Sequence, residues 1–317
     1  MKVVLTDYAY DTIRPFEEVY EAAGVEFLPM QCKTAEEVMA ATEDADAVMT
    51  HYARIDRRVI ENLKHCKIII RSAVGVENID VAAAAERGIP VANVPDYCIE
   101  EVSDYVILLL LNCAKKFRLL DRSVQAGIWD YAVTKPADSV RGKTLGLIGC
   151  GVIARAVARK AGVFGLEILG CDPNVTAESA ADAGICLVSQ EELLRRSDYV
   201  SLHVPLIEST RNLINRETLA QMKPGACLIN TARGPMVDEE ALREALLSGR
   251  LSAAALDVLV EEPIRKNHPL LGMDQVILTP HCAWYSETSM GKLLVSAAEE
   301  VVRALRGEPL HHPVRPM

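Results

Sequence analysis

The chain has 317 residues, half of them apolar, and a net charge of −10. This length suggests two domains, and the acidic balance argues against direct nucleic-acid binding, because phosphates require a basic face. Asp7 lies too close to the N-terminus to leave room for the apolar segment of a signal peptide. The longest apolar run (106–111) is too short for a membrane helix, and the nine cysteines have no C-x-x-C spacing. We therefore expect a cytoplasmic protein without membrane contact, disulfide framework or zinc site.

Short strand-like runs alternate with helical patterns through the first third of the chain. Strands are predicted at 3–6, 25–28, 47–49, 68–71 and 90–92, with helices near 15–23, 35–43, 57–65 and 81–87. This alternation indicates a parallel sheet covered by helices on both faces.

The middle of the chain, from residue 100 to about 120, lacks Gly and Pro and predicts one long helix, which a loop around Gly127 and Pro136 follows. A second alternating series has predicted strands at 144–149, 167–171, 185–188, 199–203, 226–230, 253–256 and 276–278. The last helix is predicted at 288–306, and the Pro-rich tail from 311 to 317 as a frayed end.

These patterns predict an α/β protein with two doubly wound parallel-sheet domains. If the last helix crosses back, residues 1–99 and 288–317 form one discontinuous domain that binds the substrate. Residues 100–287 then form the second domain, which binds a nucleotide.

A glycine fingerprint, G-x-G-x-x-A, falls at Gly149, Gly151 and Ala154, after a predicted strand and before a predicted helix. Gly149 permits a tight turn, Gly151 lets the backbone approach a pyrophosphate, and the small Ala154 lets the helix pack closely. The helix N-terminus, at Val152 and Ile153, offers N–H groups to the phosphates. The motif alone is weak evidence, because similar patterns occur in turns.

Asp172 strengthens the fingerprint, because it ends the next predicted strand 23 residues after Gly149. A carboxylate there binds the adenosine ribose and repels a 2′-phosphate, which predicts NAD and not NADP. The alternative makes Asp172 a turn residue ahead of Pro173.

Three polar residues, Arg233, Glu262 and His281, follow apolar strands in the second half. Because ligands bind outside the carboxyl ends of such strands, these side chains are expected to converge. An Arg fork suits a carboxylate, and a His beside a carboxylate can protonate the alkoxide that hydride transfer leaves. Singly, they also fit a surface charge, a turn residue and a core histidine. The other six histidines have no metal-ligand spacing, so no metal is expected.

At these residues the chain resembles the D-isomer-specific 2-hydroxyacid dehydrogenases, over essentially its whole length. The matching motifs lie at 74–80, 88–95, 149–154, 230–234, 255–258, 262–263 and 280–281. Residues 280–287 look most like the C-terminal-binding-protein branch. The resemblance implies a flavodoxin-like substrate domain, a Rossmann NAD-binding domain and a cleft between them that holds the active site. It also implies a homodimer, with the loop around Trp129 as an arm.

The resemblance implies that Arg233, Glu262 and His281 form the catalytic trio, with His281 as proton donor, and that Asp257 binds the nicotinamide carboxamide. The residues expected to contact NAD are Val74, Gly149, Gly151, Val152, Ile153, Asp172, His203, Val204, Pro205, Thr210, Thr231, Ala232, Arg233, Asp257, His281 and Trp284. Those expected to contact the substrate are Arg71, Val74, Gly75, Arg233, His281 and Trp284.

The function expected from these features is NAD-dependent interconversion of a small 2-keto acid and its D-2-hydroxy acid. The alternatives are an NAD(H)-sensing protein-interaction module of the corepressor type and a Rossmann protein of another chemistry. The substrate is not defined by the sequence. Trp284, three residues beyond His281, is expected to wall the pocket and to favour medium-sized apolar 2-keto acids over phosphohydroxypyruvate. It could also be a packing residue.

Overall fold

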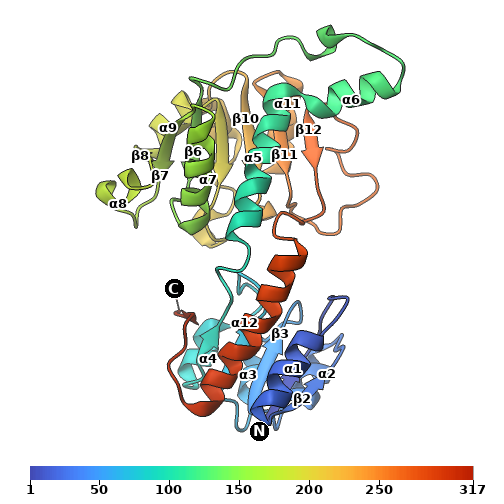
Figure 1. Ribbon diagram of the computed structural model, residues 1–317, viewed down its shortest axis with the longest axis vertical. Helices are drawn as coiled ribbons and strands as arrows, with labels where there is room; N and C mark the ends of the chain where they lie inside the picture. Colours follow the sequence, from blue (N-terminus) through green and yellow to red (C-terminus); the bar gives the residue numbers. More distant parts are fainter. Residues whose placement is uncertain (317) are drawn as a thin grey trace. The chain divides into compact units, whose positions relative to one another are not determined.

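The structure is a computed structural model that describes residues 1–316, and the chain divides into two α/β units (Figure 1). The first unit contains residues 1–98 and the C-terminal residues from 285 onward, and the second contains residues 99–284. The domain boundaries expected from the sequence, at residues 100 and 288, lie close to these positions.

The first unit is built on a six-stranded sheet with the order β13-β5-β4-β3-β1-β2. Its parallel strands are β1 (Lys2–Leu5), β2 (Glu26–Pro29), β3 (Ala47–Thr50), β4 (Ile68–Arg71) and β5 (Val91–Ala92). Its helices are α1 (Arg14–Ala23), α2 (Ala35–Thr42), α3 (Arg57–Asn62), α4 (Val81–Glu86) and α12 (Glu287–Arg306). The order 2-1-3-4-5 of the parallel strands is that of flavodoxin-like sheets. The last helix, α12, packs beside the first, α1 (Figure 1).

The C-terminal tail of this unit forms strand β13 (Pro313–Val314), which pairs antiparallel with β5. The buried carboxylate of Glu300 in α12 accepts a hydrogen bond from the His312 N–H at 2.9 Å, which fixes the entry to this strand. The expectation of a frayed end is therefore wrong for residues 311–316, and Met317 lies outside the described residues. The Pro-rich sequence of the tail gave no signal for a strand of only two residues, because its pairing depends on the distant strand β5.

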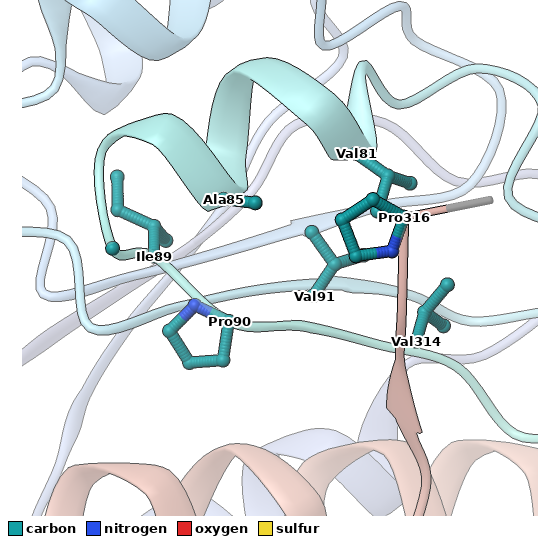
Figure 2. Close-up of a pocket in the computed structure, with 8 residues that line it drawn as sticks. Val81, Ala85, Ile89, Pro90, Val91, Val314 and Pro316 are labelled. Carbon is teal, nitrogen blue, oxygen red and sulfur yellow. The ribbon is translucent and has the colours of Figure 1, made fainter.

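A cavity of about 220 Å³ lies between the tail, α4 and β5 (Figure 2). Its lining residues are Val81, Ala85, Gly88, Ile89, Pro90, Val91, Val314 and Pro316. The lining carries no polar side chain and none of the expected site residues, so the cavity is unlike a catalytic site.

The second unit is built on a seven-stranded parallel sheet with the order β12-β11-β10-β9-β6-β7-β8. Its strands are β6 (Thr144–Ile148), β7 (Glu167–Cys171), β8 (Cys186–Leu187), β9 (Tyr199–Leu202), β10 (Ala226–Asn230), β11 (Leu251–Leu256) and β12 (Val276–Leu278). Its α-helices are α5 (Ile99–Lys115), α6 (Phe117–Gln125), α7 (Val152–Val163), α8 (Ala177–Ala181), α9 (Gln190–Arg196), α10 (Arg216–Gln221) and α11 (Glu239–Leu247). Its 3₁₀ turns are η1 (Tyr131–Thr134), η2 (Glu208–Thr210) and η3 (Gly234–Met236).

The chain order of these strands starts in the middle of the sheet, at β6, and runs outward first on one side and then on the other. This is the Rossmann arrangement, in which ligands bind where the order reverses, between β6 and β9. The predicted fold class, two doubly wound parallel-sheet α/β domains, is confirmed.

The long helix expected from residue 100 to about 120 is in fact two helices, α5 and α6. Between them Lys116 has a φ of 51°, a left-handed conformation that interrupts the helical hydrogen bonds. The Lys116 ammonium donates to the Pro136 carbonyl at 2.9 Å, so a distant loop stabilises the break. No Gly or Pro lies at the break itself, so the local sequence gives no signal that the helix is interrupted there. Between residues 1 and 316 no helix, α5 included, is long and apolar enough to cross a membrane.

Candidate active site

The turn from β6 to α7 carries the glycine fingerprint at the point where the strand order reverses. Gly149 has a φ of 94°, and a Cβ there would lie 2.6 Å from the carbonyl oxygen of His203, which follows β9. Glycine is therefore required by both backbone conformation and packing. At Gly151, the residue that caps α7, an added Cβ would meet no atom of the described chain within 4 Å. The open helix N-terminus that results fits a bound pyrophosphate.

Asp172 lies directly after β7 and holds this turn. Its Oδ2 accepts a hydrogen bond from the Cys150 N–H at 2.9 Å, and its Oδ1 accepts from the Asn174 N–H at 2.8 Å. A carboxylate offers about four acceptor positions, so ribose hydroxyls can still donate to it. Asp172 therefore orders a turn, as the alternative interpretation expected, and its carboxylate lies beside the fingerprint, while its expected contact with the adenosine ribose stays a prediction.

The loop after β9 is ordered by its own side chains. Burial lowers the pKa of His203 to about 4, so the ring is neutral at pH 7, and its Nε2 lies 2.9 Å from the Ser201 hydroxyl. The Thr210 hydroxyl donates to the Pro205 carbonyl at 2.7 Å and closes the loop. These contacts fix the segment that also carries Val204, and the expected contacts of this loop with NAD stay predictions.

The loop after β10 holds Arg233 through a buried amide. Asn230 accepts a hydrogen bond from the Ala232 N–H at 3.0 Å and donates one to the Arg233 carbonyl at 2.9 Å. Asn230 was not among the expected site residues, although a polar side chain at the end of a buried strand was a signal for it. The neighbouring Thr231 hydroxyl is buried and has no hydrogen-bond partner within residues 1–316, which fits a ligand that would complete the site.

Gly234 brings the Arg233 loop against the segment that follows β11. A Cβ on Gly234 would overlap the carbonyl group of Leu259, so only glycine permits this approach. Leu259 in turn donates its N–H to Glu262 Oε1 at 2.9 Å. The two loops that carry Arg233 and Glu262 are therefore packed together.

His281 and Glu262 form a hydrogen-bonded pair, with 2.7 Å between His281 Nδ1 and Glu262 Oε2. His281 has a φ of 52°, which is unusual for a residue with a side chain, and its N–H donates to the Asp257 carbonyl at 2.8 Å. Conformations of this kind persist where the surrounding structure enforces them, often at functional sites. The pairing that the sequence predicted between these two residues is present.

The pKa of Glu262 lies below its usual value. Burial raises this pKa, but the hydrogen bonds from His281 and from the Leu259 N–H, together with the positive charges of His281 and Arg233, lower it by more. The carboxylate is therefore ionised at neutral pH. The contact of Gly234 with Leu259 and the hydrogen bond between Glu262 and His281 bring the three residues of the expected catalytic trio to one edge of the sheet.

Asp257 forms the base beneath His281. Its side chain is 1% exposed and accepts hydrogen bonds from the Thr279 hydroxyl at 2.6 Å, the Cys282 N–H at 3.0 Å and the Ala283 N–H at 2.9 Å. This support of the 279–283 loop was not foreseen, and the expected contact of Asp257 with a nicotinamide carboxamide stays a prediction.

Trp284 follows the same loop and is bonded back to it. Its indole Nε1 donates to the His281 carbonyl at 2.9 Å, so the side chain is fixed relative to the expected proton donor. The ring is partly exposed. It is therefore more than a buried packing residue, while its contact with substrate stays a prediction.

The remaining expected site residues, Arg71, Val74 and Gly75, belong to the first unit. The Arg71 guanidinium donates to the His51 carbonyl at 3.0 Å and to Glu77 at 2.7 Å, so it is already engaged within that unit. The roles of these three residues toward substrate and cofactor stay predictions. In the part of the chain described, no group of three or more His, Cys, Asp or Glu could hold a metal ion.

Comparison with known proteins gives consistent results. Residues 107–283 match the model of the D-isomer specific 2-hydroxyacid dehydrogenase NAD binding domain. A D-3-phosphoglycerate dehydrogenase of Methanocaldococcus jannaschii is 40% identical over 311 residues, covering 97% of this chain and 58% of that protein. The chain spans only 51 to 58% of the length of the first three phosphoglycerate dehydrogenases that it matches.

Two further relatives match over nearly their whole length. A hydroxypyruvate reductase of Thermotoga maritima is 38% identical over 275 residues, covering 86% of this chain and 88% of that protein. The crystal structure of a glyoxylate reductase from Paecilomyes thermophila is 29% identical and superposes with a TM-score of 0.90, covering 99% of this chain and 98% of that one.

Proposed function

Because this chain belongs to the D-isomer-specific 2-hydroxyacid dehydrogenase family, whose NAD-binding domain it contains, we propose that it interconverts a small 2-keto acid and the corresponding D-2-hydroxy acid. The observation that carries the proposal is the 2.7 Å hydrogen bond between His281 and Glu262, on the sheet edge that also bears Arg233. The test is NADH oxidation by purified protein with a panel of 2-keto acids, followed by chiral analysis of the product. Absence of turnover with every acid of the panel contradicts the proposal.

The proposed roles follow from the atoms that each side chain can offer. Arg233 binds the substrate carboxylate and polarises the adjacent carbonyl group. Since Nδ1 of His281 is engaged by Glu262, Nε2 is the ring atom that donates a proton to the carbonyl oxygen during reduction. The ionised Glu262 stabilises the imidazolium and fixes its orientation. NADH, when bound, supplies the hydride.

The residues that fit the cofactor are those of the turn after β6 and its neighbours. Gly151 leaves room for the pyrophosphate at the start of α7, Gly149 permits the tight turn against His203, and the carboxylate of Asp172 lies beside the same turn. The unpartnered hydroxyl of Thr231 is a further candidate contact.

Asp172→Ser is expected to raise the Kd for NADH by about 10- to 100-fold and to reduce discrimination against NADPH. The substitution removes the ribose acceptor and the charge that repels a 2′-phosphate. Fluorescence titration with both cofactors measures the change. Asp172→Asn is the matched control, because it can still accept from the Cys150 N–H but carries no charge. Unchanged cofactor preference in both variants shows that another group selects the cofactor.

For the substrate side chain, two observations point in different directions. The names of the relatives indicate short polar acids, whereas Trp284 presents an indole next to His281. The guanidinium of Arg71 is held by Glu77, which reduces its availability to a phosphate group. We propose that medium-sized apolar 2-keto acids are used with higher kcat/KM than phosphohydroxypyruvate, hydroxypyruvate or glyoxylate.

Trp284→Ala is expected to lower kcat/KM most for the apolar acids. The loss should correspond to about 1–3 kcal/mol of transition-state binding, the usual value of a good hydrophobic contact. Trp284→Phe is the control, because it keeps an aromatic face but loses the hydrogen bond to the His281 carbonyl. Losses confined to the alanine variant identify a pocket wall. Equal losses for every substrate, or strong wild-type preference for phosphohydroxypyruvate, contradict the substrate proposal.

The alternative, an NAD(H)-sensing interaction module, is not favoured, since the relatives are named as dehydrogenases and reductases. We also propose that the protein acts in the cytoplasm as a homodimer, with the loop around Trp129 as an arm. The exposure of Trp129 (90%) in this loop supports this proposal, because a large apolar side chain exposed on the surface often marks an interface.

A further inference from the structure

The loop between β11 and β12 carries Glu262 in an exposed stretch. All eight residues from 260 to 267 are exposed, and the flanking residues Leu259 and His268 are buried. An exposed segment of this kind has little packing to hold a side chain within hydrogen-bond distance of a partner. Its attachments at both ends therefore decide where Glu262 stands.

Both ends of this loop are held by one carboxylate, that of Glu239. Its Oε1 accepts a hydrogen bond from the Val260 N–H at 2.8 Å, and its Oε2 lies 3.0 Å from Nε2 of His268. The two side chains are largely buried, with 17% of Glu239 and 6% of His268 exposed. Hydrogen bonds to a charged acceptor are stronger than neutral ones, and more so away from water.

Glu239 and His268 are each held in place by their surroundings. Glu239 is the first residue of α11, whose N-terminus is capped by Asp238 through a hydrogen bond from the Ala241 N–H at 3.0 Å. On the other side, Nδ1 of His268 accepts a long hydrogen bond, 3.4 Å, from the N–H of the buried Leu270. With Nδ1 as acceptor, Nε2 carries the proton that is donated to Glu239.

A short path connects Glu239 to the expected catalytic pair. The Val260 N–H bound by Glu239 directly follows Leu259, whose own N–H binds Oε1 of Glu262. The second oxygen of Glu262, Oε2, binds His281. Displacement of the Val260 peptide therefore moves the donor that orients Glu262.

We propose that Glu239, supported by His268, is a positioning residue that keeps Glu262 against His281 during the reaction. The inference rests on the proposed function, in which His281 donates the proton. It adds two residues outside the catalytic trio whose effect on the chemistry passes through Glu262. Sequence reasoning considered His268 only as a potential metal ligand, because its partner is 29 residues away.

Glu239→Ala removes both attachments, so we expect kcat for keto-acid reduction to fall by about 10- to 100-fold. The alkaline limb of the pH–kcat profile should move to lower pH, as in Glu262→Gln, because the imidazolium loses its carboxylate. The Kd for NADH should stay at the wild-type value. Glu239→Gln keeps one acceptor and should give a smaller effect of the same sign, which preserves the test if the alanine variant does not fold.

Glu240→Ala is the matched control, since Glu240 is the next residue of α11, is exposed and pairs only with the helix neighbour Arg243 among the ion pairs of the described chain. It should leave kcat and the pH profile unchanged. The double variant Glu239→Ala/Glu262→Gln should be no slower than Glu262→Gln alone, because the first residue acts through the second. Multiplied losses in the double variant, or lower thermal stability with a wild-type pH profile, overturn the inference.

A second measurement keeps this inference separate from the proposed function. If the wild-type protein reduces no 2-keto acid, the proposed function is wrong, but the NMR titration of the His281 ring still reports on its contact with Glu262. In Glu239→Ala the titration midpoint should move toward that of Glu262→Gln. An unmoved midpoint overturns the positioning role, whatever the reaction.

Discussion

His281→Asn is expected to lower kcat for keto-acid reduction by about a hundredfold or more, the usual contribution of general acid catalysis. Asn cannot supply a proton to the carbonyl oxygen at neutral pH. It tolerates the left-handed backbone that His281 adopts, with its φ of 52°, so the loop should keep its N–H bond to the Asp257 carbonyl.

Steady-state kinetics and NADH titration measure this change separately. NADH affinity should stay near the wild-type value, because the turn that fits the pyrophosphate follows a different strand, β6. A variant that turns over at the wild-type rate shows that the proton comes from another group, and the mechanism is then wrong.

The direction in which stability and activity change with pH follows from the ionisation of Glu262 and His281. Since its pKa is lowered, the carboxylate is ionised through the neutral range and loses its charge only as the pH falls through this lowered value. The stabilisation that it gives the folded pair is therefore present above the ordinary glutamate pKa and lost in acid. Reduction needs a protonated His281 and should slow toward alkaline pH, whereas oxidation of the hydroxy acid needs the neutral ring and should accelerate there.

The fold and the principal site residues were predictable because local patterns carry them. The glycine fingerprint and Asp172 indicate a nucleotide-binding unit from residues only 23 positions apart, and the alternation of strands and helices implies parallel sheets. Residues at the ends of parallel strands reach one edge of the sheet, so topology predicted that Glu262 and His281 converge, and the family resemblance implied their roles.

What escaped prediction depends on contacts between residues distant in sequence. Lys116 adopts its left-handed conformation beside Pro136, and the tail pairs with a strand more than 200 residues earlier. Glu239 holds the loop of Glu262, yet in the sequence it does not differ from an ordinary acidic residue in the first turn of a helix. Local sequence does not specify such partners, because their energy arises only in the folded chain.

Arg233→Lys is expected to lower kcat/KM for the keto acid by about a hundredfold, although the charge is kept. The planar guanidinium has five N–H donors and can bind a carboxylate through two parallel hydrogen bonds, whereas an ammonium acts as a point charge. Here Nη1 of Arg233 also donates to the Ala232 carbonyl at 2.6 Å, which aligns the plane of the fork. A lysine cannot hold that carbonyl and present a bidentate fork at the same time.

The backbone should not mask this effect, because Asn230 and Gly234 fix the loop independently of the side chain at 233. Arg216→Lys is the matched control, since Arg216 is exposed on α10 in the same unit and should be replaceable without kinetic change. The expected loss lies in kcat and in the KM for the keto acid, measured at saturating NADH. If only the NADH affinity falls and the KM for the keto acid is unaltered, Arg233 does not bind the substrate, and another cationic residue binds its carboxylate.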